Sequence, residues 1–595
     1  MTSATTGRNS QKVSVTVTRT SSKKHSAEVT WLDRRFFLIA ACLIFLMAAV
    51  QFGSIVQESQ SNDEAVHLAS GYSYLVTGDY RMDLAHPAFG RILAALPLLL
   101  LNLNSQVGTE AWVKHDSVTF AQLFLYHNRV PADTLLLYSR SVIIGLSALF
   151  AVWLACWTRR YFGSSIALLA LAFFVFDPTV IAHGRYVTTD LVVSLFMFVT
   201  ITLWASYLRK PSFRTLILAS IALGLALVSK YSALYLLPIL AVLYCFAWYT
   251  KRSEAFFTFP RLFAVFLIVA LISTTVVAVV YTPEVLAHIR YVKTGQISNP
   301  VVTVPLRQMV TPNNAISKLL VAFGTVSRVP SYTYLLGLSY LSDHNEAGNP
   351  AYLLGKVSTR GWKLYFPIAF LVKTPTAVLL ACALAIGALL IVRRRPRKPL
   401  MMFCLAIPPL VYFICSISVH IDIGVRHILP IYAFFYVLLA VVVFEYVRPM
   451  LGAWFPLTIT LLLGLLAVES LGSYPDYLAF FNWLSGGSDN GTSYLLDSNV
   501  DWGQNIKKLG RYLEEKNLYP VCPALFGQTD LDYYGIGAHS VGWPGSNKRA
   551  TNCVVAVSVN MLHGLYSSPE QFATLRQREP DAIIGHSIYV YDLRH

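Results

Sequence analysis

Charged residues are scarce in this chain, and their scarcity excludes most classes of soluble protein. Asp, Glu, Lys and Arg make up only 13% of the 595 residues, whereas 55% are hydrophobic. The mean hydropathy is +0.53. A soluble globular protein of this composition would expose apolar surface and aggregate through it. The sequence therefore predicts a polytopic membrane protein.

Acidic residues are scarcer than basic ones, 31 against 47, which gives a formal net charge of +16. A basic chain can bind nucleic acid, but here the basic residues fall in short segments between apolar runs. Topology signals of membrane proteins are distributed in this way. We therefore expect no nucleic-acid partner.

Cysteines with the spacing of a metal site are also lacking. Six of the eight lie in apolar runs, among them Cys42, Cys156 and Cys245, and we interpret them as packing residues. The other two, Cys522 and Cys553, lie near the C-terminal end. An oxidising compartment would permit a disulfide between them, and the paired and unpaired states both stay open.

Eleven apolar runs are predicted to form transmembrane helices, because each is long enough to cross much or all of the hydrocarbon layer. No cleavage signal follows the first run, which is therefore expected to be retained. Residues 1–30 precede it, and their Ser, Thr and Lys content predicts a disordered cytoplasmic tail. The runs lie near 36–56, 136–157, 164–181, 190–208, 214–229, 231–250, 262–282, 366–392, 400–419, 428–446 and 454–472.

Basic residues divide the loops into two sets. Arg159-Arg160, Arg209-Lys210, Lys251-Arg252, the 393–398 cluster and Arg448 fall in alternate short loops, which the positive-inside rule places in the cytoplasm. The long loops 57–135 and 283–365, and the chain after residue 472, then face outward.

We accordingly expect an all-α polytopic domain over residues 31–472 and a small extracytoplasmic α/β domain over 473–595. Runs rich in β-branched residues predict strands at 553–559 and 582–591, and apolar spacing predicts a helix at 504–513. In the first outer loop, the apolar segment 91–101 is too short to span a membrane. It suits a helix in the membrane interface with Arg91 near the headgroups, or a loop helix packed on the bundle.

Carboxylates stand at the ends of two apolar runs on the predicted outer side. Asp63 and Glu64 follow the first run, and Asp190 begins another. Such carboxylates are costly unless they are solvated or paired, so they are candidates for function. For Asp190 alone, helix capping is the simpler explanation.

Basic side chains gather on the same predicted face, where the topology rule disfavours them. A phosphate or diphosphate site would explain the set, whereas pairing with carboxylates or snorkelling would explain any single member. The set comprises His86, Arg91, His183, Arg185, Lys230, Arg426 and His427.

Several longer motifs make the chain resemble GT-C fold glycosyltransferases that use a polyprenyl-phosphate sugar. It is similar to the protein O-mannosyltransferase family (glycosyltransferase family 39) and to bacterial aminoarabinose transferases. The resemblance runs from about residue 31 onward. It is carried by DEAVH at 63–67, SGYSYLVTGD at 70–79, HP at 86–87, TTD at 188–190, GWKLYFP at 361–367, KTP at 373–375, IGVRHILP at 423–430 and DSNVDWGQ at 497–504.

This resemblance implies that Asp63 is the catalytic base of an inverting transfer, with Asp190 and Glu64 as further catalytic carboxylates. The donor would be a polyprenyl-phosphate sugar, and the acceptor a hydroxyl of a protein, lipid or glycan. The departing lipid phosphate would be bound by fixed cations. The candidates are His86, Arg91, Lys230, Arg426 and His427.

Other parts of the motifs leave alternatives open. Tyr72, Tyr74, Asp501 and Trp502 are candidates for binding sugar or acceptor, but Trp502 could instead anchor the outer domain on the membrane. The family often continues His-Pro-Pro, whereas this chain has Ala88 after Pro87, so the residue that grips the phosphate stays open. No metal site is predicted, although three carboxylates could hold a divalent cation.

A transporter or flippase of lipid-linked saccharides is the alternative function. Transporters place polar groups near the bilayer midplane, often in repeated halves with broken helices. Here the apolar runs are clean and the polar residues gather at one face, which favours chemistry on a lipid headgroup. The resemblance implies a bacterial inner (plasma) membrane with an extracytoplasmic catalytic face.

Overall fold

The computed structural model describes residues 20–251, 259–287, 315, 317–319, 332–537 and 552–594. Most of the predicted tail and part of the predicted loop 283–365 therefore lie outside the described residues. The first helix, α1 (Thr20–Ile55), begins inside the segment predicted as a tail.

Each of the eleven predicted apolar runs forms a helix or a pair of helices. By length and composition, seven stretches among the described residues could cross a membrane, or eight if the bent pair α16–α17 is one span. The number is smaller than eleven because α7 and α10 have only 12 and 15 residues, and α19 and α21 belong to one stretch. The helices are α1, α6 (Ala132–Phe162), α7 (Ser164–Val175), α9 (Asp190–Arg209), α10 (Phe213–Leu227), α11 (Leu236–Thr250), α12 (Phe259–Val280), α16 (Tyr365–Lys373), α17 (Thr376–Ile391), α18 (Pro399–Ile417), α19 (Leu429–Val442) and α21 (Phe455–Leu471).

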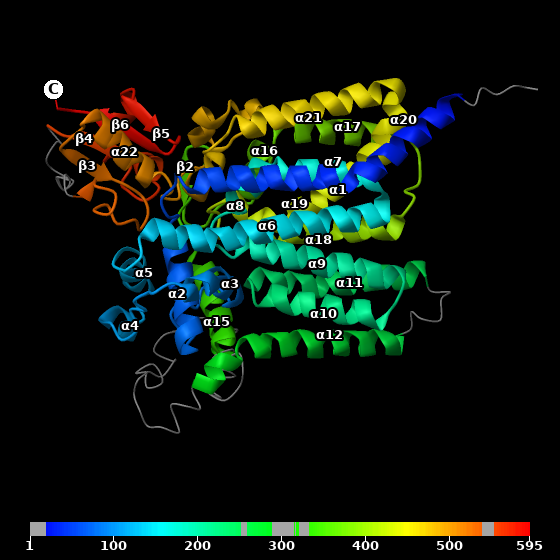
Figure 1. The fold of residues 1–595 in the computed structure, drawn as a ribbon, viewed down its shortest axis with the longest axis horizontal. Coiled ribbons are helices and arrows are strands. Elements are labelled where there is room, and N and C mark those ends of the chain that lie inside the picture. Colours follow the sequence, from blue (N-terminus) through cyan, green and yellow to red (C-terminus); the bar gives the residue numbers. More distant parts are fainter. Residues whose placement is uncertain are drawn as a thin grey trace, which may run out of the picture.

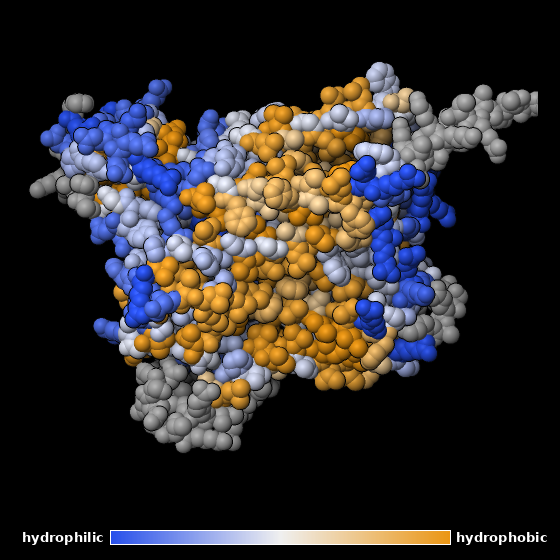
Figure 2. All heavy atoms as spheres, viewed as in Figure 1, coloured by the Kyte–Doolittle hydropathy of each residue, from blue (hydrophilic) through white to orange (hydrophobic). Residues whose placement is uncertain are grey.

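These helices form one bundle with an apolar outer surface. Figure 1 shows them side by side, and Figure 2 shows a broad hydrophobic area across the same region on the face that is drawn. Phe45 and Leu390 are 75% and 77% exposed on this surface. A contiguous apolar surface of this extent suits lipid rather than water. The predicted class, a helical polytopic membrane protein with a small α/β part, is confirmed.

Basic residues from different loops meet at one end of the bundle. The Lys398 ammonium donates to the carbonyl of Tyr161, and the Arg209 guanidinium lies 5.3 Å from the Tyr161 ring centroid. Lys251 Nζ donates to the carbonyl of Arg209 at 3.2 Å. The loops that the positive-inside rule groups together are therefore neighbours in space.

The opposite end carries short helices and the C-terminal sheet (Figure 1). The short helices are α2 (Glu64–Thr77), α3 (Phe89–Ala95), α4 (Glu110–Lys114), α5 (Ser117–Tyr126), α8 (Pro178–His183) and α15 (Tyr332–Ala347). A small hairpin of β1 (Ala351–Leu353) and β2 (Lys356–Ser358) lies in the same part of the chain.

The segment predicted as an interfacial or loop helix is α3 followed by the 3₁₀ turn η1 (Leu96–Leu100). Leu99 and Leu100 are exposed, as a lipid-facing end would be, but Arg91 is only 1% exposed. Of the two alternatives, a helix packed on the bundle agrees better with the structure than contact of Arg91 with headgroups, because its guanidinium is paired in the interior with Asp83.

The C-terminal sheet has four strands in the order β3-β4-β6-β5: β3 (Val521–Ala524), β4 (Val554–Ser558), β5 (Ala582–Ile584) and β6 (Ile588–Asp592). β3 and β4 are parallel, and the other two pairs are antiparallel. Helix α22 (Ile506–Lys516) covers the sheet with Ile506, Leu509 and Leu513. Residues 582–591, expected as one strand, form the β5–β6 hairpin because Gly585 and His586 adopt positive φ angles.

Cys522 and Cys553 are joined by a disulfide at one end of the β3–β4 pair. Of the paired and unpaired states that the sequence leaves open, the structure has the paired one. Strand β3 was not predicted, because it has only four residues and contains Pro523.

Candidate functional site

Asp63 lies at the N-terminal end of α2, after the short connection that follows the end of α1 at Ile55. Its Oδ2 accepts a hydrogen bond from Arg426 Nη1 at 2.9 Å. The Asp63 side chain is 29% exposed, whereas that of Arg426 is 7% exposed. Asp63 is therefore the accessible member of a largely buried ion pair.

Arg426 joins Asp63 to the second predicted aspartate. It lies in the 3₁₀ turn η5 (Val425–Ile428), and its Nη1 is 3.7 Å from Asp190 Oδ2. The other oxygen of Asp190 is 2.5 Å from Lys230 Nζ. Asp190 begins α9, and Lys230 stands just before the 3₁₀ turn η2 (Tyr231–Tyr235). Four residues from distant parts of the sequence thus form one charged cluster, Asp63–Arg426–Asp190–Lys230.

A second group surrounds Arg91. Its Nε donates to His67 Nδ1 at 2.9 Å, its Nη1 donates to the Tyr74 hydroxyl at 3.1 Å, and its Nη2 pairs with Asp83. The His86 ring centroid lies 5.3 Å from that of His67. Burial, followed by the charge of Arg91, lowers the pKa of His67 to about 3. His67 is therefore neutral and accepts from Arg91 through Nδ1.

Several buried nitrogen atoms near the cluster have no hydrogen-bond partner among the described residues: Arg426 Nε, His427 Nε2 and His183 Nδ1. His427 interacts electrostatically with Lys230, Arg426 and Asp190. Buried polar atoms are normally satisfied by protein, water or ligand. These nitrogens are consequently the groups that a polar ligand at the cluster could satisfy.

Glu64 is not part of this cluster, although it is the sequence neighbour of Asp63. Its two oxygens accept from Arg140 Nη2 at 2.6 Å and Nε at 2.9 Å, and from the backbone N–H groups of Ser61 and Val187. The carboxylate is fully buried and fully hydrogen-bonded. Its position suits a structural role rather than contact with a substrate.

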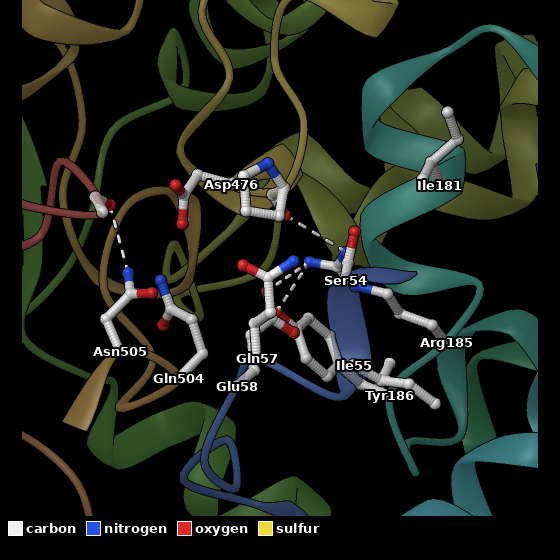
Figure 3. Close-up of polar contacts among 12 residues, drawn as sticks. Ser54, Ile55, Gln57, Glu58, Ile181, Arg185, Tyr186, Asp476, Gln504 and Asn505 are labelled. Carbon is white, nitrogen blue, oxygen red and sulfur yellow. Dashed lines mark hydrogen bonds and ion pairs between the residues drawn. The ribbon is translucent and has the colours of Figure 1, made fainter. Parts of the chain in front are cut away.

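Arg185 is likewise held in an ion pair away from the cluster. Its Nη2 is 2.7 Å from Glu58 Oε1, and its guanidinium lies 5.1 Å from the Tyr186 ring centroid. Figure 3 shows this network beside Asp476, Gln504 and Asn505. Burial raises the pKa of Glu58, while the charge of Arg185 opposes that rise. Arg185 thus follows the alternative in which outer cations pair with outer carboxylates.

The candidates for binding sugar or acceptor are mostly enclosed. Tyr72 packs on Phe124 with ring centroids 5.0 Å apart, and the Tyr74 hydroxyl is engaged by Arg91. Asp501 is fully buried, and burial raises its pKa to about 7. Trp502 is 1% exposed, with its ring centroid 4.0 Å from the Arg426 guanidinium carbon. Trp502 is therefore enclosed by protein and does not present its side chain to lipid as a membrane anchor would.

The three carboxylates proposed as a possible cation site do not converge. Asp63 and Asp190 both contact Arg426, while Glu64 binds Arg140. Across the described ranges, no group of three or more His, Cys, Asp or Glu side chains is arranged to hold a metal ion. These residues do not fit a divalent cation.

Sequence reasoning missed Asp83 and Asp497. Asp83 pairs with Arg91, and Asp497 interacts electrostatically with Arg426 and Asp63. Burial raises the pKa of Asp497 to about 6, although a hydrogen bond from Tyr566 opposes the rise. Asp497 is the first residue of the DSNVDWGQ motif, so this motif could have identified it as a candidate site residue.

Comparisons with solved structures give distant similarities. ArnT from Cupriavidus metallidurans bound to undecaprenyl phosphate is 11% identical with a TM-score of 0.44, over 92% of this chain and 97% of that one. The Archaeoglobus fulgidus oligosaccharyltransferase is 11% identical with a TM-score of 0.46, over 89% and 72%. The S. cerevisiae protein O-mannosyltransferase Pmt1–Pmt2 complex bound to the sugar donor is 18% identical with a TM-score of 0.33, over 47% and 37%.

A search of curated proteins found no match to the chain. A family model does match, over residues 135–281, which contain Asp190 and Lys230 but not Asp63 or Arg426. This segment covers most of α6 and the helices that follow it, to the end of α12. The resemblance to a mannosyltransferase family is confirmed for this segment, because residues 135–281 match the family described as dolichyl-phosphate-mannose-protein mannosyltransferase.

Proposed function

We propose that this protein is a membrane glycosyltransferase that moves a hexose-type sugar from a polyprenyl-phosphate carrier to an acceptor hydroxyl. The observation that carries the proposal is the partly exposed Asp63 carboxylate, which lies beside two largely enclosed cations, Arg426 and Lys230. Acceptor activation needs such a base, and departure of a lipid phosphate needs such cations. The family match over residues 135–281 supports the same class of donor.

In the proposed reaction, Asp63 takes the proton from the acceptor hydroxyl. The acceptor oxygen forms a bond to the anomeric carbon as the bond from that carbon to the phosphate oxygen breaks. The bonding electron pair leaves with the lipid phosphate, and the configuration at carbon inverts. The reaction written in this way balances in atoms and electrons without a cofactor.

The cations nearest Asp190 are the proposed phosphate-binding groups. Lys230 and Arg426 supply positive charge, and Arg426 Nε and His427 Nε2 have hydrogen-bonding capacity that no described residue uses. Arg91 is a weaker candidate because Asp83, His67 and Tyr74 already occupy its donors. His86 stays a candidate, since it lies beside His67 and interacts electrostatically with Lys230 and Asp190.

We further propose that the cluster faces the extracytoplasmic side, in a bacterial inner (plasma) membrane. The basic loops gather at the end of the bundle opposite the cluster, which the positive-inside rule would place in the cytoplasm. The Cys522–Cys553 disulfide, which forms in an oxidising compartment, supports the same orientation. In this arrangement, residues 31–472 form the membrane domain and 473–595 the outer domain.

The test compares purified wild type with Asp63→Asn, using a radiolabelled sugar on polyprenyl phosphate. We expect at least about a 100-fold loss of turnover, because removal of a general base costs this much or more. Donor binding should change little. Asp530→Asn is the matched control, because Asp530 has a similarly exposed side chain, 24%, and pairs only weakly with His127. Equal turnover by Asp63→Asn and wild type would refute the assignment of the base.

A further inference from the structure

The segment 497–504 contacts the chain on both sides of the Asp63–Arg426 pair. On the Asp63 side, the backbone N–H of Asn62 donates to the carbonyl of Trp502 at 2.7 Å, and that of Ser59 donates to the carbonyl of Gln504 at 2.9 Å. The residues directly preceding Asp63 are therefore bonded to the backbone of this segment.

On the Arg426 side, three contacts come from the same segment. Asn499 Oδ1 accepts from the backbone N–H of Val425 at 2.9 Å, and Ser498 Oγ donates to the carbonyl of Ile423 at 2.7 Å. Gly424 lies between them, and an added Cβ there would meet Ser498 Oγ at 2.2 Å. The turn that carries Arg426 is thus packed closely against the segment.

The third contact is made by the side chain of Trp502. Its ring lies 4.0 Å from the Arg426 guanidinium carbon, a cation–π distance. The indole also packs against Tyr186 and His183, with ring centroids 5.9 and 6.1 Å away. With 1% of its surface exposed, Trp502 has no free face for a sugar ring. The Trp502 ring therefore contacts Arg426 and other protein side chains, and it is not placed to contact a substrate.

The segment is itself anchored to the membrane bundle. Asn499 Nδ2 donates to the Tyr365 hydroxyl at 2.9 Å, and Lys373 Nζ donates to the carbonyls of Asn499 at 2.5 Å and Leu478 at 3.0 Å. Lys373 is 2% exposed. These buried contacts give the segment a fixed position relative to α16, from which it can hold Arg426.

We propose that Trp502 and Asn499 are positioning residues, which hold the Arg426 guanidinium against Asp63 and Asp190. The outer segment is then an integral part of the active site rather than a separate sugar-binding module or a membrane anchor. This inference rests on the proposed function for its kinetic readout. Without the indole of Trp502, the Arg426 guanidinium can move away from Asp63 and Asp190. Small displacements of charged catalytic groups slow catalysis strongly.

The experiment compares three variants of the full-length protein: Trp502→Phe, Trp502→Met and Trp204→Met. The control, Trp204, is also fully buried, but it packs among Tyr207, Tyr244 and Phe266 in the helical bundle. We expect Trp502→Met to lower kcat by about tenfold or more with donor KM little changed. Trp502→Phe, which keeps an aromatic face under Arg426, should retain most of kcat.

A double-mutant cycle with Arg426→Lys separates positioning from general stability. If Trp502 acts through Arg426, Trp502→Met should have much less effect on kcat in the Arg426→Lys background. The same cycle measured on the thermal midpoint requires no turnover, so it tests the contact even if no donor is cleaved. Equal effects in both backgrounds would overturn the inference, and so would loss of kcat by Trp502→Phe equal to that by Trp502→Met.

Asn499→Leu is a second variant in case Trp502→Met does not fold. It removes the acceptor for the backbone N–H of Val425 while leaving Trp502 in place. The expected result is again a lower kcat with donor binding retained. Normal kcat in Asn499→Leu would contradict the role of Asn499. A wild type that binds the donor but never cleaves it would instead refute the proposed function and leave the thermal cycle as the test of the inference.

Discussion

Neighbouring residues in the DEAVH motif have different surroundings. Asp63 points to Arg426, whereas Glu64 points to Arg140, because adjacent residues at the start of a helix do not share a face. The residue pattern alone therefore identifies the carboxylates but not which of them reaches the cluster; only the family resemblance singles out Asp63. The pairings of Lys230 with Asp190 and of Arg426 with Asp63 join residues 40 and 363 positions apart, and these depend on the tertiary fold.

A pH dependence of stability follows from the buried, neutral His67. Its folded-state pKa of about 3 lies below the ordinary value of 6.5, so the unfolded chain binds a proton that the folded chain excludes. Stability is then lost as the pH falls from about 6.5 towards 3. Between pH 7.5 and 5 this single group should cost about 2 kcal/mol of unfolding free energy.

His67→Asn tests this point, because the Asn Oδ1 can still accept from Arg91 but does not titrate. Thermal unfolding at pH 7.5 and pH 5 should show a smaller loss for His67→Asn than for wild type. His127→Asn is the control, since the His127 side chain is 63% exposed. An unchanged pH dependence in His67→Asn would show that His67 is not held neutral.

At the scale of elements, apolar runs predict the helices well, because burial in lipid demands a continuous apolar stretch. What they do not predict is where a run bends. The run 366–392 is divided into α16 and α17, at an angle of 108°, by Thr374 and Pro375. A proline cannot continue the backbone hydrogen bonding of the helix that precedes it. The hairpin in 582–591 was missed for a similar reason, since two positive φ angles interrupt a run of strand-forming residues.

Arg140 connects three elements of the outer end. From α6 it binds Glu64 at the start of α2 and donates to the carbonyls of Ile55 and Ser59, where the chain leaves α1. Arg140→Met should destabilise the protein by about 3–5 kcal/mol, because it leaves the buried Glu64 carboxylate without its cationic partner.

The double variant Arg140→Met/Glu64→Gln should recover part of that loss, since no buried charge remains. Thermal unfolding in detergent measures both variants, with the exposed Arg129→Met as the control. If Arg140→Met unfolded at the wild-type temperature, the ion pair would not hold these elements together.

At the scale of the whole molecule, the distribution of charge in the sequence predicted which loops lie together at each end of the bundle. The basic loops meet at one end, and the carboxylate cluster and the sheet lie at the other (Figure 1). The contact between the C-terminal segment and Arg426 was not predictable, because the DSNVDWGQ motif shows no periodicity that reveals its partner.

The disulfide offers a test of the compartment in which the C-terminal sheet lies. Cys522 and Cys553 are separated by 31 positions, and closing a loop of that length should contribute roughly 3–4 kcal/mol. Cys522→Ser/Cys553→Ser should therefore lower the thermal midpoint, and reduction of wild type should do the same. Free thiols at both positions in protein isolated from its membrane without reductant would contradict an extracytoplasmic sheet.

The most direct test of the central claim is the chemical fate of the donor in sealed proteoliposomes. Wild-type protein is incubated with a polyprenyl-phosphate sugar and a panel of hydroxyl acceptors, and the lipid is analysed by mass spectrometry. We expect the donor to become polyprenyl phosphate, with the sugar recovered on an acceptor or in water. Intact donor that has moved between leaflets would contradict the account and would identify the protein as a flippase.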